Sequence, residues 1–195
     1  MLHDYLTAQR QILAILADYG ASFRTVNLGG NLATIRGGIE RLLQHDIRGL
    51  TELSIQLLDL PTDKLPENWE YIFPLNFPEK ASFAKLTGGL QAFRVSGAPF
   101  HWDTMAFSTR LAEFRIDNLV LGHDTAIAPF LQVLSSASGL RDLKIISVIT
   151  FRDSTPSHKI QPSPPVAFPN LQRLLLQDLY CNTLQSLILM IAPGS

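Results

Sequence analysis

The feature of this chain that most constrains its fold is a recurring triplet of apolar residues with the spacing Leu-x-x-Leu-x-Leu. The triplet occurs six times, and the two residues that follow each first apolar position are polar or small. The copies are Phe23-Val26-Leu28, Leu50-Leu53-Ile55, Leu90-Phe93-Val95, Leu111-Phe114-Ile116, Leu140-Leu143-Ile145 and Leu171-Leu174-Leu176. A unit of this kind cannot bury its apolar edge alone, so it must pack against another copy of itself.

The spacing of the copies predicts the fold class. Their first positions are separated by 27, 40, 21, 29 and 31 residues, and leucine-rich repeats recur about every 20–29 residues. Turn-forming residues, whose backbone freedom suits the entry into a strand, directly precede four copies: Gly49, Gly89, Gly139 and Asn170. We therefore predict an irregular leucine-rich-repeat solenoid of the α/β class, with parallel strands on the concave side and helices and loops on the convex side. The alternative is an ordinary α/β sheet domain.

Local sequence patterns predict the extent of the domain and the positions of its loops, strands and helices. Residues 1–195 are expected to form a single domain, truncated at its C-terminus because no capping unit is visible. Proline-rich composition predicts two long loops, at 59–78 and 152–170. Strands are expected at 24–28, 51–57, 91–96, 112–117, 141–148 and 172–176, and helices at 4–18, 33–44, 79–87, 125–137 and from about 182 onward.

Composition excludes several classes of partner. A hydrophobic content of 46% with 17% charged residues indicates a folded core. The net charge is −1 and lysines and arginines do not cluster, which argues against nucleic acid. We find no signal peptide and no apolar run long enough to span a bilayer, so we expect no membrane partner and a cytoplasmic or nuclear location. The single cysteine, Cys181, excludes an intramolecular disulfide and is expected to lie in the core.

Two clusters of chemically capable residues suggest possible active sites. They are His101-Trp102-Asp103 and His123-Asp124, and neither has the spacing of a recognised metal site. The simpler interpretation is that Trp102 fills a gap in the core and that Asp124 lies at the N-terminus of a helix. We therefore predict no catalytic residue, no cofactor and no metal. The alternative is a hydrolase or transferase with its site near His101/Asp103 or His123/Asp124.

Strand alternation predicts one charged surface on the concave side. The fifth position of each unit should point there, which would stack Arg94, Arg115 and Lys144 in a row. The third and seventh positions should place Glu113, Asp142 and Asp117 beside that row. These charges either compensate one another, as surface ion pairs of little net energy do, or bind a polar or acidic segment of a partner protein.

The stretch from Phe83 to Val148 resembles the C-terminal repeats of fungal F-box proteins of the mushroom type. The residues that carry the resemblance there are 89–95 (GLQAFRV), His101-Trp102, 110–116 (RLAEFRI), 127–134 (IAPFLQVL) and 138–143 (SGLRDL), and the block 168–174 (FPNLQRL) also resembles that family. The resemblance implies the substrate-recognition repeats of a ubiquitin ligase adaptor, with a protein partner on the concave face. The N-terminal F-box of that family is missing here, so contact with the ligase core would require an F-box outside this chain. A structural scaffold unrelated to ubiquitin is the remaining hypothesis.

Overall fold

The main sheet contains the six strands that correspond to the six triplets. The computed structural model describes residues 14–15, 19, 22–44, 49–58, 71–152 and 165–191. In this part of the chain the strands of the main sheet follow one another in chain order, and every neighbouring pair is parallel. They are β1 (Thr25–Gly30), β2 (Glu52–Leu57), β3 (Ala92–Ser96), β4 (Glu113–Asp117), β6 (Asp142–Ile146) and β8 (Arg173–Gln177).

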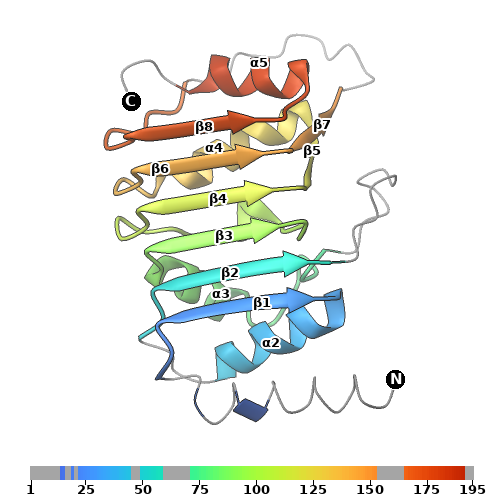
Figure 1. The fold of residues 1–195 in the computed structure, drawn as a ribbon, viewed down its shortest axis with the longest axis vertical. Coiled ribbons are helices and arrows are strands. Elements are labelled where there is room, and N and C mark those ends of the chain that lie inside the picture. The colour runs from blue at the N-terminus through green and yellow to red at the C-terminus, as the bar shows by residue number, and fades with distance from the viewer. Residues whose placement is uncertain are drawn as a thin grey trace.

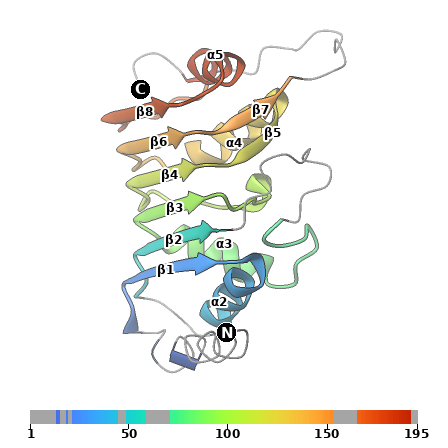
Figure 2. The same cartoon turned by 45° about the vertical axis from the view of Figure 1, so that its right-hand side comes forward.

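Helices lie on one side of this sheet only (Figures 1 and 2). They are α2 (Leu32–Gln44), α3 (Lys80–Gly89), α4 (Ile127–Ser135) and α5 (Cys181–Met190), with short 3₁₀ turns η3 (Trp102–Thr104) and η4 (Asp124–Ala126). We call the opposite side of the main sheet the open face, because no helix among the described residues covers it. Within the described ranges, no helix has the length and apolar content needed to cross a membrane.

The prediction of an irregular leucine-rich-repeat solenoid is wrong. The structure is an α/β fold with a parallel six-stranded main sheet, and the connections between its strands do not repeat one another. The segment from β1 to β2 contains α2, whereas the segment from β4 to β6 contains β5 (Val120–His123), η4 and α4. A second sheet pairs β5 with β7 (Ile149–Phe151). The triplets specify the strands and their pairing, but the apolar residues between them differ in number and spacing, so each connection packs differently.

Most individual elements that periodicity predicts are present. Every predicted strand of the main sheet and the predicted helices over 33–44, 79–87, 125–137 and from 182 are observed, with ends shifted by a few residues. The predicted helix at 4–18 lies almost entirely outside the described residues. Residues 59–70 and 153–164 of the two predicted loops also lie outside them. The strands β5 and β7 were not predicted.

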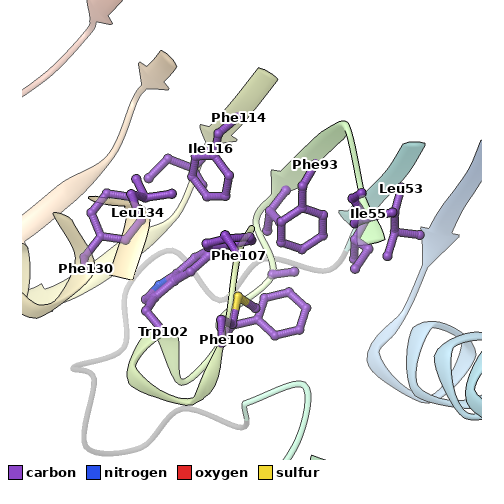
Figure 3. Close-up of a cluster of buried hydrophobic side chains, with 14 of the residues drawn as sticks. Leu53, Ile55, Phe93, Phe100, Trp102, Phe107, Phe114, Ile116, Phe130 and Leu134 are labelled. Atoms are coloured by element: carbon purple, nitrogen blue, oxygen red, sulfur yellow. The ribbon is translucent and has the colours of Figure 1, made fainter. Parts of the chain in front are cut away.

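The centre of the core is aromatic and lies beneath β3 and β4 (Figure 3). Phe93 and Phe114, from neighbouring strands, are fully buried with their ring centroids 5.9 Å apart. Trp102 packs edge-on against Phe130 of α4 at 5.3 Å, and it is buried. The prediction that Trp102 fills a gap in the core is therefore confirmed. This packing holds β3 and β4 in place and fixes the positions of the side chains on their open face.

The strands end in a repeated left-handed residue. A residue with a positive φ directly follows each of the strands β3, β4, β6 and β8. These residues are Gly97, Asn118, Ser147 and Asp178, with φ of 67°, 50°, 50° and 52°. The backbone N–H of three of them extends the pairing by donating to the neighbouring strand, at distances of 2.9–3.1 Å. Glycine, asparagine and aspartate tolerate this conformation better than most residues.

Candidate functional site

The parallel register aligns charged side chains on the open face. Arg94, Arg115 and Lys144 are direct partners across β3, β4 and β6. In the adjacent row Glu113 is the partner of Asp142. Because side chains alternate between the two faces of a strand, these residues lie opposite the buried core positions of the same strands. The strands therefore place the charges predicted from the sequence side by side.

Arg94 is the centre of the first half of this arrangement. Its guanidinium donates to both carboxylate oxygens of Glu113, with Nε–Oε1 at 3.0 Å and Nη2–Oε2 at 2.8 Å. A third contact joins Nη1 to Oε2 of Glu52 at 3.2 Å. The two parallel bonds to Glu113 have the geometry that makes arginine–carboxylate pairs strong. Hydrogen bonding from Arg94 lowers the pKa of Glu113, and hydrogen bonding to Glu113 raises the pKa of Arg94.

Lys144 continues the arrangement toward the last strand. Its Nζ lies 3.6 Å from Oε1 of Glu113 and 3.2 Å from Oδ2 of Asp142. The same Oδ2 lies 2.9 Å from Nη2 of Arg173 in β8. We call the connected residues, together with the pair Arg115–Asp117 at 2.7 Å, the charged network. Its members are Glu52, Arg94, Glu113, Arg115, Asp117, Asp142, Lys144 and Arg173.

All six residues predicted from the sequence belong to the charged network. The prediction missed two members, Glu52 and Arg173. Both occupy the third position of their units, which is the position that brought Glu113 and Asp142 into the prediction. That positional signal was sufficient to find them. The network contains four acidic and four basic side chains, so its formal charge is balanced.

In two ion pairs of the charged network, the acidic and basic side chains differ in how far they reach into solvent. The side chains of Asp142 and Asp117 are 8% and 11% exposed, whereas those of their partners Arg173 and Arg115 are 77% and 42% exposed. The short carboxylates lie close to the sheet and the longer cations extend above them. In addition, Oδ1 of Asp142 is buried and has no hydrogen-bond partner within the described part of the chain. In these pairs the outermost layer is therefore cationic, although the network is neutral.

Of the predicted cluster at His101 and Asp103, only His101 lines a very small hollow. The His101 ring stacks on Tyr71 with centroids 3.8 Å apart, and burial lowers the pKa of His101. Asp103 is exposed. Aromatic residues, including Phe73 and Phe100, line the adjoining hollow, whose volume of about 20 Å³ is enough for roughly one water molecule.

The predicted cluster at His123 and Asp124 has a structural role. Oδ1 of Asp124 accepts hydrogen bonds from Oγ1 of Thr150 at 2.5 Å and from Nδ2 of Asn182 at 2.8 Å. These bonds connect η4, β7 and α5. Asp124 is also the first residue of η4, which leads directly into α4, so the prediction that it lies at the N-terminus of a helix is confirmed.

Two further expectations concern metals and the cysteine. Across the described ranges, no three histidine, cysteine or acidic side chains lie together in a way that could hold a metal ion. Cys181 is exposed at the start of α5, so the expectation that it lies in the core is wrong. Comparisons with protein-family models, with curated proteins and with solved structures return no match to this chain.

Proposed function

We propose that this chain is a protein-interaction domain that binds a polar or acidic segment of a partner protein on its open face. The observation that supports this proposal is the layered arrangement of two ion pairs in the charged network, Arg115–Asp117 and Arg173–Asp142. Arg115 and Arg173 extend outward, and their carboxylate partners lie close to the sheet. At these two pairs a partner's carboxylates would therefore meet the arginines before they reach Asp117 and Asp142.

The free donors of the outer arginines fit such a partner. A guanidinium carries five N–H donors. Arg115 uses only its Nε in its contact with Asp117 among the described residues. Its two terminal nitrogens remain available to an incoming carboxylate.

Reversal of the charges on the open face tests the proposal. The double variant Arg94→Glu plus Arg115→Glu should lose the partner proteins that the tagged unmodified domain recovers from a host lysate. Quantitative mass spectrometry of the recovered proteins measures the loss. Because Glu at position 94 would lie between Glu52 and Glu113, far-UV circular dichroism must show that the variant is folded. Arg115→Glu alone is the milder second variant.

A matched control keeps the same change in net charge on other surfaces. Lys85 and Arg110 are exposed and do not belong to the charged network. The variant Lys85→Glu plus Arg110→Glu should recover the same partners as the unmodified domain. Unchanged recovery with the open-face variants would refute the proposal, and so would equal loss with the control.

The resemblance to fungal F-box proteins extends the proposal to a role in substrate recognition for a ubiquitin ligase adaptor, acting in the cytoplasm or nucleus. We assign the chain no catalytic role. The full gene product should then co-purify with a cullin scaffold if it carries an F-box. Absence of ubiquitin-ligase components from that purification would remove the ligase role and would leave the interaction surface unaffected.

A further inference from the structure

The outer edge of β8 carries an apolar surface next to the charged network, to which Arg173 of the same strand belongs. β8 has β6 on one side and no other strand of the described chain on the other (Figures 1 and 2). Leu174 and Leu175 point to opposite faces of β8 and are 42% and 40% exposed. Ile188 and Leu189 of the following helix α5 are also exposed. A regular apolar edge strand is a template for pairing with another chain.

Backbone contacts show which groups at this edge are available. The N–H of Arg173 donates to the carbonyl of Arg141, and the carbonyl of Gln177 accepts from the N–H of Ser147, both at 2.9 Å. These odd-numbered residues therefore direct backbone groups toward the rest of the main sheet. Successive residues of a strand direct them to alternate sides. The N–H and carbonyl groups of Leu174 and Leu176 consequently point outward.

We propose that β8 pairs antiparallel with β8 of a second copy of this chain, around a two-fold axis at Leu175. Leu174 of one copy then lies opposite Leu176 of the other. Both residues present outward backbone groups, so each such pair exchanges two hydrogen bonds. Leu175 of one copy lies opposite Leu175 of the other. The two main sheets become one continuous sheet, with both open faces on the same side.

Charge favours this arrangement over parallel pairing of two β8 strands. β8 begins with Arg173, and Asp178 follows its last residue. Parallel pairing in register would place the two Arg173 side chains beside each other, and like charges on neighbouring strands are destabilising. Antiparallel pairing brings Arg173 of one copy to the strand end where the other copy carries Asp178. The same strand is therefore complementary to itself only in the antiparallel direction.

Sedimentation velocity over a range of concentrations tests the dimer. The unmodified chain should change from monomer to dimer as concentration rises. Leu175→Lys should abolish the dimer, because two cations would face each other at the axis. Leu75→Lys, which changes another exposed leucine, should leave the dimer intact. A monomer at every concentration would overturn the proposal. So would growth beyond the dimer, which indicates head-to-tail assembly.

A disulfide experiment tests the register and does not depend on the lysine variant. In a Cys181→Ser background, Leu175→Cys places two thiols directly opposite each other, at a separation that a disulfide can bridge. Mild oxidation should then produce a covalent dimer. Gln177→Cys in the same background is the control, because that residue faces Arg173 of the second copy. Equal cross-linking at positions 175 and 177, or none at 175, would contradict the two-fold pairing.

Discussion

At the scale of single residues, two glycines in equivalent positions have different roles. Gly139 and Gly89 both directly precede the first apolar residue of a triplet. Conformational freedom in the turn was the reason expected from the sequence, yet neither residue has a positive φ. A Cβ atom at Gly139 would lie 2.0 Å from the backbone oxygen of Thr109, whereas a Cβ at Gly89 would meet nothing within 4 Å. Close packing therefore explains the glycine at 139 only.

This difference predicts unequal effects of the same substitution. Gly139→Ala should lower the free energy of unfolding by about 1–3 kcal/mol, because the backbone of another segment must move. Gly89→Ala is the matched control and should change it by less than about 0.5 kcal/mol. Urea denaturation of the two variants measures both values. Equal effects at the two positions would show that the contact with Thr109 does not constrain Gly139.

Glu113 should make the stability of the protein depend on pH. Its pKa is lowered in the folded chain, chiefly by the hydrogen bonds from Arg94. Its contribution is therefore fully present above the pKa of an unfolded glutamate, about 4.3, and is lost as the pH falls through the lower folded value. Glu113→Gln should reduce the free energy of unfolding on the order of 1 kcal/mol at neutral pH.

The acid range provides the check on this assignment. The difference between Glu113→Gln and the unmodified protein should begin to shrink as the pH falls below the pKa of an unfolded glutamate, and should disappear once the pH is below the lowered folded pKa of Glu113, where both side chains are uncharged. Urea denaturation at neutral and acidic pH gives the two differences. Glu40→Gln, at an exposed position of α2, controls for the loss of a carboxylate elsewhere. A difference that stays constant with pH would mean that the Arg94–Glu113 contact does not stabilise the fold.

At the scale of elements, the residues with left-handed backbone that follow the strands should favour glycine over alanine. Ser147 has a φ of 50° and donates its N–H to Gln177 of β8. A Cβ atom makes this conformation unfavourable by about 1–2 kcal/mol, and glycine avoids that cost. Ser147→Ala should therefore be less stable than Ser147→Gly by about 1 kcal/mol, as thermal or urea unfolding would show. In helices alanine is instead more favourable than glycine. A Ser147→Ala variant more stable than Ser147→Gly would therefore argue against a left-handed conformation at position 147.

The helix α5 is attached to the rest of the fold by a buried polar cluster. Oγ1 of Thr183 lies 2.8 Å from Oγ1 of Thr150 and accepts a hydrogen bond from the Thr150 N–H at 3.2 Å. Both threonines are buried. Thr183→Val should lower the free energy of unfolding by about 1–3 kcal/mol, because it leaves buried polar groups unpaired. Thr125→Val, at an exposed position, should have little effect. Comparable stability of the two variants would exclude this anchoring role.

The sequence predicts strands far better than it predicts the connections between them. In β2, β3, β4 and β6 the fourth and sixth triplet positions, such as Phe93 and Val95, are buried as expected, because apolar alternation requires one buried face. The charged network follows from the same register. By contrast, β5 and β7 are only four and three residues long, which is too short for a periodic pattern. The bond from Thr150 to Asp124 joins residues far apart in the chain, and local spacing carries no signal for such a contact.

At the scale of the whole molecule, packing is strongest at the centre of the sheet and weakest at β8. Phe93 and Phe114 of β3 and β4 are fully buried, whereas Leu174 and Leu175 of β8 are both substantially exposed. Segments with few buried apolar contacts open at lower free-energy cost. Local opening should therefore begin at β8 and should reach β3 and β4 only when the whole chain unfolds.

Hydrogen exchange measured by mass spectrometry checks this gradient. In dilute solution, which disfavours the proposed pairing of two β8 strands, peptides from β3 and β4 should exchange most slowly, and peptides from β8 should exchange much faster. If β8 pairs with a second copy, its protection should rise with protein concentration, while that of β3 and β4 should stay constant. Leu175→Lys should remove this concentration dependence without altering protection at the centre. Uniform protection across all the strands would show instead that the sheet opens as a single unit, despite the uneven burial of its two ends.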